Sequence, residues 1–274
     1  MENAAHAVAR VITEKLGGSV KGKSILILCG KGNNGGDGAA LARILGMEGA
    51  FVEIVSFGKV NETKGDAQTN FKIFCGGKVE LDDGDWSFEF GDLREIGSLE
   101  DWDSYVGTSN QDWNVVVDAL FGTGLTRPIE GWMANVLHDI NILNDTQIAY
   151  FNYGRIRVSV DMPSGLNADS GNVMGENFWS DLTVTFTAPK MANVLPPASS
   201  YSKDLIVAEI GSPMELVDCQ PTETYLAEAS DALAWLGDSM FSDHSYKNKR
   251  GHALVIAGSE SYSGAAVLAG NAAM

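Results

Sequence analysis

The stretch Cys29-Gly30-Lys31-Gly32-Asn33-Asn34-Gly35-Gly36-Asp37-Gly38 follows an apolar run, residues 24–28, and precedes a helical run, residues 39–47. This order of strand, glycine turn and helix is typical of phosphate-binding sites in α/β proteins. Glycines allow a tight turn and a close approach to a ligand, and the free amide groups at the start of a helix attract anions. The stretch therefore predicts a binding site for a phosphorylated small molecule.

The GxGxxG pattern that starts at Gly30 is weak evidence by itself, because chance matches are common in a glycine-rich chain. A tight turn without any ligand is the alternative. An NAD-binding fingerprint also needs an acidic residue near the end of the second strand. Glu53 lies at about the right distance, but in the middle of the strand expected over residues 51–57. The fit to an ordinary NAD-binding fingerprint is therefore incomplete.

Polar side chains within the glycine turn set it apart from a simple phosphate loop. Asn33 and Asn34 are adjacent, and Asp37 follows three residues later. Amide and carboxylate groups can orient polar groups of a ligand or coordinate a cation through oxygen. We therefore expect this turn to bind more than a phosphate group.

Size and composition limit the class of protein. The chain has 274 residues, of which 45% are hydrophobic, enough for one large α/β domain or two smaller ones. Its net charge of -17 argues against sequence-independent binding to nucleic acid. The three cysteines are widely spaced without a CxxC pair, so neither a disulfide framework nor a zinc site is supported. With no membrane-length apolar run and no secretory signal, we expect a cytoplasmic protein.

Apolar runs that suit strands alternate with segments of helical periodicity. This alternation predicts a three-layer α/β fold, in which a doubly wound, mostly parallel, Rossmann-like sheet has helices on both faces. Ligands of such sheets bind at the carboxyl ends of the strands. A crowded acidic segment, residues 80–103, is interpreted as a solvated insertion. The expected strands of this sheet are residues 24–28, 51–57, 113–117, 156–160, 182–186 and 205–210. A further strand, residues 252–257, is expected before a second glycine turn, residues 258–266.

Two more loops after expected strands contain residues capable of chemistry. One begins at Asp118 and continues through a Gly-Thr-Gly turn to Arg127, which can pair with a phosphate through two hydrogen bonds. The other begins at Asp161. Each aspartate alone could simply cap the backbone of a turn. Two carboxylates and an Asn-rich glycine turn at three strand ends of one sheet indicate a common site.

Four segments together resemble the NAD(P)H-hydrate epimerase family, also called the YjeF N-terminal domain. They are residues 30–38, 118–128, 161–165 and 185–190, and they occur in the family's order. The resemblance covers residues 1–211, and it implies that the family's first helix is missing. Residues 212–244 are interpreted as a linker. Residues 245–274 resemble the truncated start of a ribokinase-like, ADP- or ATP-dependent NAD(P)H-hydrate dehydratase domain, whose catalytic aspartate motif would lie beyond Met274.

The resemblance implies repair of a damaged nicotinamide nucleotide. In NAD(P)H hydrate, water has added at carbon six of the nicotinamide ring, and the epimerase interconverts its R and S forms. By similarity, Asp161 would contact the altered ring, and Asn34, Asp118 and Ser164 would bind a potassium ion together with backbone carbonyl oxygens. The other substrate-binding residues implied are Asn33, Asn34, Gly35, Gly36, Asp37, Gly122, Thr123, Gly124, Leu125, Thr126, Arg127 and Pro128.

The reaction needs an acid and a base. Inversion at a carbinolamine carbon requires the hydroxyl group to leave, pushed by the ring nitrogen, and water to return from the opposite face. A carboxyl group can protonate the departing oxygen and then deprotonate the incoming water. Asp161 is the candidate for this group. Lys190 is a second candidate, as an electrostatic partner, although an ordinary surface lysine is the simpler interpretation.

Three other interpretations remain open at this point. The glycine turn could belong to a nicotinamide-dependent oxidoreductase of the Rossmann type. The fold is also used for non-catalytic scaffolds that dimerise and associate with RNA, which the acidic charge and the retained Asp118 and Asp161 disfavour. The chain could also have the motifs without the activity. A homodimer is possible by the resemblance.

Overall fold

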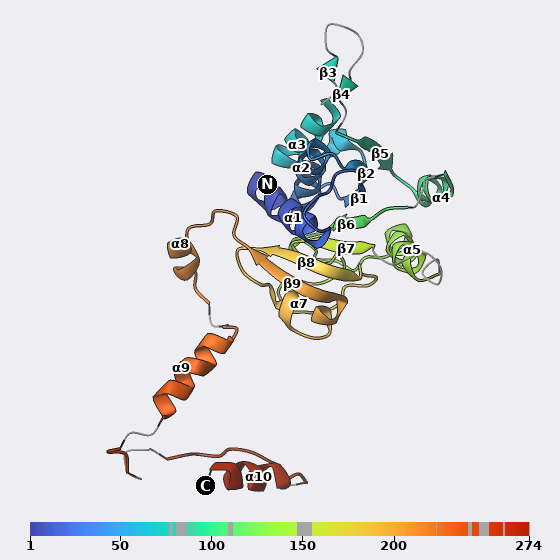
Figure 1. Cartoon of the computed structure of the whole chain (residues 1–274). Coiled ribbons are helices and arrows are strands. Elements are labelled where there is room, and N and C mark those ends of the chain that lie inside the picture. Colours follow the sequence, from blue (N-terminus) through green and yellow to red (C-terminus); the bar gives the residue numbers. More distant parts are fainter. Residues whose placement is uncertain are drawn as a thin grey trace. The chain divides into compact units, whose positions relative to one another are not determined.

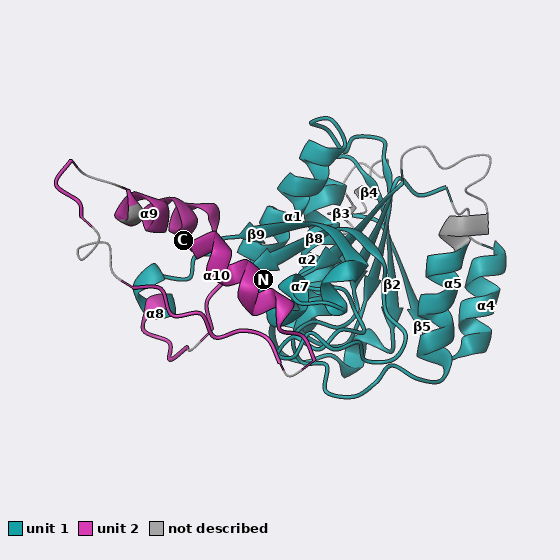
Figure 2. Ribbon diagram, turned by 90° about the horizontal axis from the view of Figure 1, so that it is seen from below, with its two compact units in different colours: residues 1–217 teal, residues 218–274 magenta. Residues whose placement is uncertain are grey.

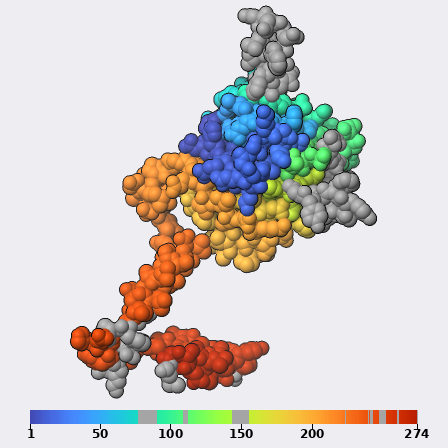
Figure 3. Space-filling view, in the orientation of Figure 1, coloured from blue at the N-terminus to red at the C-terminus, as the bar shows by residue number. Residues whose placement is uncertain are grey.

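The computed structural model describes residues 1–76, 79–80, 87–88, 90–108, 112–146, 155–222, 224–240, 243–246, 252–259 and 261–273. The chain divides into two compact units, Met1–Val217 and Asp218–Met274, which are coloured separately in Figure 2. The first unit contains the sheet and all of the motifs singled out above except the second glycine turn near the C-terminus. Figure 3 shows the surface of this unit, in which the blue N-terminal elements and the yellow later strands form one body.

A seven-stranded sheet in the order β5-β2-β1-β6-β7-β8-β9 forms the centre of the first unit (Figure 1). Every pair of neighbours in it is parallel, as the alternating pattern predicted. From β1 the chain adds β2 and then β5 on one side. It then crosses back to add β6, β7, β8 and β9 on the other side, so the direction of winding reverses between β1 and β6. The strands are β1 (Ser24–Cys29), β2 (Phe51–Phe57), β5 (Asp92–Ile96), β6 (Val115–Ala119), β7 (Ile156–Val160), β8 (Ser180–Phe186) and β9 (Ser202–Ala208).

Helices cover both faces of the sheet, which explains why its central strands are apolar without alternation. On β1, Ile25 and Ile27 pack with α1 (Glu2–Lys15), α2 (Asn33–Met47) and α3 (Gly65–Gly76). Leu26 and Leu28 belong to the core on the other face, under α4 (Leu99–Thr108) and α5 (Trp132–Thr146). The three-layer α/β arrangement is therefore confirmed. Among the residues described, no helix is long and apolar enough to cross a membrane.

The acidic segment is more than a solvated insertion, and that interpretation was wrong for its second half. Residues Asp92–Ile96 form the edge strand β5, which pairs in parallel with β2. The helix α4 that follows buries Trp102 and Tyr105 against the sheet. The charged side chains of β5 face solvent at a sheet edge, so the apolar pattern that marks a central strand is absent there. Residues 81–86 and 89 lie outside the described part.

The helix after the glycine turn begins earlier than expected. It starts at Asn33, with Gly32 as its N-cap, and not near residue 39. Asn33, Asn34 and Asp37 therefore lie in the first turns of α2 and not in a loop. The two glycines between them, Gly35 and Gly36, are poor helix formers that concealed this start.

Short elements connect the main ones. They are η1 (Val60–Glu62), the antiparallel pair β3 (Val79–Glu80) and β4 (Ser87–Phe88), α7 (Met191–Val194) and η2 (Ala198–Tyr201). Helix α8 (Met214–Asp218) ends the first unit. The second unit contains α9 (Ala229–Ser239) and α10 (Gly264–Ala273). The strand expected over residues 252–257 is not formed, since residues 252–259 have no strand assignment and no described strand pairs with them.

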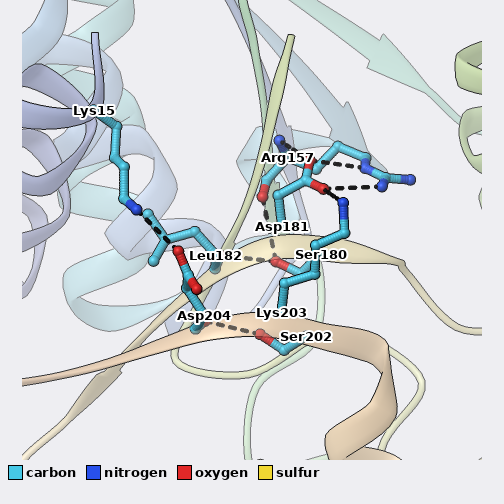
Figure 4. Close-up of polar contacts among 8 residues, drawn as sticks. All are labelled: Lys15, Arg157, Ser180, Asp181, Leu182, Ser202, Lys203 and Asp204. Atoms are coloured by element: carbon cyan, nitrogen blue, oxygen red, sulfur yellow. Dashed lines mark hydrogen bonds and ion pairs between the residues drawn. The ribbon is translucent and has the colours of Figure 1, made fainter. Parts of the chain in front are cut away.

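Ion pairs tie together the amino ends of the last strands (Figure 4). Asp181, at the start of β8, accepts hydrogen bonds from Arg157 at 3.1 Å and from Lys203 at 2.7 Å. Partial burial raises the pKa of Asp181, but these bonds outweigh it and hold the pKa below its ordinary value. Lys15 of α1 similarly pairs with Asp204 at 2.9 Å. These contacts lie at the end of the sheet opposite the predicted site.

Candidate functional site

A cleft of about 840 Å³ opens at the carboxyl ends of the central strands. It lies where the winding of the sheet reverses between β1 and β6, the usual ligand site of open α/β sheets. Three of the predicted segments contribute to its wall, from the start of α2, from the loop after β6 and from the end of β7. The lining residues are Gly30, Lys31, Gly32, Asn33, Asn34, Asp37, Phe57, Gly58, Lys59, Glu62, Ile96, Gly97, Leu120, Phe121, Gly122, Thr123, Gly124, Leu125, Trp132, Met133 and Asp161.

Glycines at the start of α2 are required by packing between backbone segments. A Cβ on Gly35 would overlap the carbonyl oxygen of Gly30, and one on Gly30 would overlap the carbonyl oxygen of Leu120. A Cβ on Gly36 would lie 2.7 Å from Ala67 Cα on helix α3. These contacts place the loop after β6 directly against the turn after β1. Of the glycines in this turn, Gly30 and Gly32 line the cleft.

Asp118 organises the floor of the site. It is fully buried in β6 and accepts a hydrogen bond from the Ser164 hydroxyl at 2.6 Å and one from the Ser164 amide at 2.7 Å. The hydroxyl of Ser164 also accepts a bond from the amide of Phe121 at 2.9 Å. Burial raises the pKa of Asp118 to about 6, and its hydrogen bonds limit the rise. This network ties the loop after β6 to the loop after β7.

Asn34 lies beside this network. A Cβ on Gly122 would be 3.5 Å from Asn34 Oδ1, so the amide faces the loop after β6. Asn34 is buried, and its Nδ2 has no hydrogen-bond partner in the described part of the chain. A buried amide without a partner is costly, and its two ends can exchange by rotation. The side chain is therefore poised to interact with a group that is not part of the protein.

Asp161 lies at the end of β7 in a left-handed backbone conformation, with φ of 68°. Its Oδ1 accepts hydrogen bonds from Lys190 Nζ at 2.5 Å and from Thr185 Oγ1 at 3.2 Å. Lys190 also donates to Thr185 Oγ1 and to the carbonyl oxygen of Phe186. Oδ2 of Asp161 has no hydrogen bond to any described residue, while the residue lines the cleft. One carboxylate oxygen is thus held by a cation and the other is available.

Asp37 is the second carboxyl group in the cleft wall. Burial raises its pKa to about 7; the Met1 amino group opposes the rise, and the charge of Asp161 adds to it. The effect of Asp161 indicates that the two carboxyl groups act on each other electrostatically. The site therefore contains two carboxyl groups in different environments, one whose pKa is raised by burial and one that is ion-paired to Lys190.

Comparison with known proteins identifies the family. The profile of the family described as "YjeF-related protein N-terminus" matches residues 1–192. The chain belongs to the YjeF-related N-terminal domain family. It is 35% identical to the NAD(P)H-hydrate epimerase of Rhodopirellula baltica, over 79% of this chain and 76% of that protein. It is also similar to the bifunctional NAD(P)H-hydrate repair enzyme Nnr of Moorella thermoacetica, with 36% identity over 100% of this chain and 47% of that protein.

The chain spans about half the length of the bifunctional relatives that it matches. Among solved structures, the crystal structure of yeast ynu0 has a TM-score of 0.57 at 23% identity and covers 84% of this chain and 86% of its own. At that identity the similarity shows the fold alone. It supports the α/β fold independently of the sequence motifs.

The YjeF-related fold brings most of the predicted site residues together. Asn33, Asn34, Asp37, Gly122, Thr123, Gly124, Leu125 and Asp161 line the cleft. Gly35, Gly36, Thr126, Arg127 and Pro128 are not among its lining residues, so their contact with a ligand stays a prediction. Asp118 and Ser164 lie buried beneath the cleft. Lys190 is partly buried and ion-paired, so its interpretation as an ordinary surface lysine was wrong.

Several lining residues were not anticipated from the sequence. Lys31 belongs to the quoted turn but was not assigned a role, and Lys59 and Glu62 follow β2. Trp132 and Met133 come from the start of α5. Lys59 could have been predicted as a site residue, because it comes just after an apolar strand. Trp132 could not, because an aromatic residue at the start of a helix is common and does not indicate a binding site.

The raised pKa of Asp37 predicts a pH effect on stability. A carboxyl group whose pKa is about 7 when folded and 3.8 otherwise binds more protons in the folded state between those values. Stability from this group is therefore present at low pH and lost as the pH rises from about 4 to about 7. We expect Asp37→Asn to gain stability relative to the parent over that range, by on the order of 3 kcal/mol at pH 8.

Urea unfolding of both proteins at several pH values from 4.5 to 8 measures this effect. Asp66→Asn, at an exposed aspartate in the first turn of α3, is a matched control that should show no such trend. A stability difference between Asp37→Asn and the parent that does not change with pH would contradict the prediction.

Proposed function

We propose that this chain interconverts the R and S forms of NAD(P)H hydrate, as the names of its epimerase relatives suggest. One observation supports this more than any other. The start of α2, the loop after β6 and the end of β7 meet around a single cleft, with Asp161 in its wall. Had these three segments faced separate regions, no single nucleotide could contact all of them.

The start of α2 suits the phosphate groups of such a substrate. Gly32 caps the helix, and the first amide groups of α2 have no partner within the helix. The loop 122–125 lies next to it and also lines the cleft. In this proposal the two segments bind the phosphates and riboses and direct the nicotinamide ring toward Asp161.

Asp161 is proposed to act on the hydroxyl group at carbon six. When the ring nitrogen pushes that group out as water, a proton must be supplied, and when water adds to the other face a proton must be removed. Oδ2 of Asp161 is free for this exchange while Lys190 holds Oδ1. Lys190 acts as a positioning residue, because its three hydrogen bonds go to protein atoms and it does not line the cleft.

Asp37 is proposed as the source of the proton near neutral pH. With a pKa of about 7, this carboxyl group is protonated in roughly half of the molecules at neutral pH, and it lines the same cleft. A carboxylic acid and a carboxylate in different environments can divide the two proton transfers between them. This division extends the sequence-based expectation, in which Asp161 performed both steps.

A potassium ion fits the residues beneath the cleft. The donors would be the amide oxygen of Asn34, a carboxylate oxygen of Asp118 and the remaining lone pair of the Ser164 hydroxyl. If the Asn34 amide is rotated so that its oxygen takes the position of the unpartnered Nδ2, the ion gives this buried position a partner, which supports the assignment. An amide oxygen and a hydroxyl oxygen beside a single carboxylate suit a weakly bound monovalent cation. Bound there, the ion would supply positive charge close to the phosphates.

Epimer exchange is the direct test. A mixture of R and S hydrate is prepared at unequal ratio, and its return to equilibrium is followed by chromatography. We expect rapid exchange in potassium buffer and a loss of at least tenfold when tetramethylammonium, a much larger cation, replaces potassium. No exchange in potassium buffer would overturn the proposed function, and equal rates in both buffers would overturn the potassium site.

A further inference from the structure

Two lysines and one glutamate line the cleft at the carboxyl end of β2. Lys31 Nζ lies 2.5 Å from Glu62 Oε2, and both side chains are about half exposed, at 50% and 52%. The stem of Lys31 crosses Gly58, where even a Cβ would overlap it. Lys59 follows immediately, and its charge also contributes to lowering the pKa of Glu62. This group lies to one side of the glycine turn, away from Asp161.

The end of the second strand has a known meaning in dinucleotide-binding sheets. An acidic residue there accepts hydrogen bonds from the ribose 2′-hydroxyl of NAD, whereas a cation accommodates the 2′-phosphate of NADP. In this chain, Glu53 lies in the first half of β2 and pairs with Arg94 at 3.3 Å, so it is not at that end. The residues that do line the cleft there include two cations.

The spacing across the sheet agrees with a dinucleotide that spans the cleft. The order β2-β1-β6-β7 separates the Lys59 end from the Asp161 end by three strand steps, about 14 Å at 4.8 Å per step. The glycine turn after β1 lies between them. A nicotinamide at Asp161 thus leaves the pyrophosphate at the turn and the adenosine ribose beside Lys31 and Lys59. Apolar wall residues for an adenine ring are available in Phe57, Trp132 and Met133.

We propose that Lys31 and Lys59 bind the 2′-phosphate of the adenosine ribose and make this chain selective for NADPH hydrate over NADH hydrate. The proposal rests on the proposed function for the reaction, although the phosphate site can be tested without it. Glu62 acts as an internal competitor, because it occupies Lys31 when no phosphate is bound. A 2′-phosphate replaces Glu62 as the ion-pair partner of Lys31. A 2′-hydroxyl carries no charge and cannot displace Glu62.

Calorimetric binding of 2′,5′-ADP and of 5′-AMP, which differ only in the 2′-phosphate, tests the site directly. The parent chain should bind 2′,5′-ADP at least tenfold more tightly, since each charged hydrogen bond to phosphate is worth about that factor. Lys31→Gln should reduce this ratio roughly tenfold, and Glu62→Gln should increase it. Lys64→Gln, which removes an exposed lysine two residues from Glu62 but outside the cleft lining, is the matched control and should leave the ratio unchanged.

Epimer exchange then links the site to the reaction. The kcat/KM for NADPH hydrate should fall about tenfold in Lys31→Gln, with little change for NADH hydrate. Equal losses for both hydrates would mean that Lys31 binds a phosphate common to both, which would overturn the selectivity. If the parent shows no epimer exchange but 2′,5′-ADP still binds selectively, the proposed function fails while the phosphate site stands. If 2′,5′-ADP and 5′-AMP bind equally, the phosphate site itself is wrong.

Discussion

Asp161→Asn should reduce epimer exchange by about 10² to 10⁴-fold, the usual contribution of a general acid or base. The amide has nearly the shape of the carboxylate, and asparagine tolerates the left-handed backbone found at this position. The substitution therefore removes the proton-accepting group while the end of β7 keeps its conformation. Lys190 loses its counter-charge but keeps its bonds to Thr185 and Phe186.

The measurement is the rate of R to S exchange at saturating hydrate, together with the melting temperature of each protein. Asp169→Asn is the matched control, because Asp169 is an exposed aspartate in the loop after β7 that does not line the cleft. We expect its exchange rate to equal that of the parent. Exchange at the parental rate in Asp161→Asn would remove this residue from the acid-base role, and the cleft would remain a binding site only.

Gly35→Ala should destabilise the protein by about 3 kcal/mol or more. The new Cβ would overlap the carbonyl oxygen of Gly30, which is backbone and cannot move aside as a flexible side chain can. Gly30 is itself pressed against the carbonyl oxygen of Leu120, so the strain would reach the loop after β6. The start of α2 and the loop after β6 would be forced apart at the place where they meet.

Urea unfolding at one pH compares this variant with Gly32→Ala. Gly32 lies three residues earlier, has an extended backbone that alanine can adopt, and has no heavy atom within 4 Å of a new Cβ. We expect its stability to change by less than about 1 kcal/mol. A similarly small change in Gly35→Ala would show that the turn can relax, and that these glycines are not needed for packing.

The central sheet could be predicted because burial on both faces leaves continuous apolar runs. Residues 24–28 and 51–57 agree with β1 and β2 to within one residue. The edge strands were harder to predict from the sequence. β9 lies about three residues earlier than expected, and β5 is so charged that its segment resembles a loop. Pairing with β2, and not the pattern of β5, determines that strand.

The candidate site was predictable to the extent that its residues follow strands. Asp161 and the loop 122–125 follow strand ends, and the topology then brings them together. The ion pair of Lys190 with Asp161 joins residues 29 positions apart and leaves no local signal. The same is true of Lys31 and Glu62, which are 31 positions apart and meet only through the geometry of β2. Long-range pairs of this kind need coordinates.

The support of Asp161 by the later strands limits how far the site can be treated as a module. Every residue that lines the cleft lies between positions 30 and 161, so a fragment ending after β7 would contain all of them. Such a fragment would nevertheless lack Lys190, Thr185 and the β8 and β9 strands that position them. Grafting the three cleft segments onto another scaffold would therefore transfer a pocket with an uncompensated charge, and the smallest transplantable piece is the whole sheet.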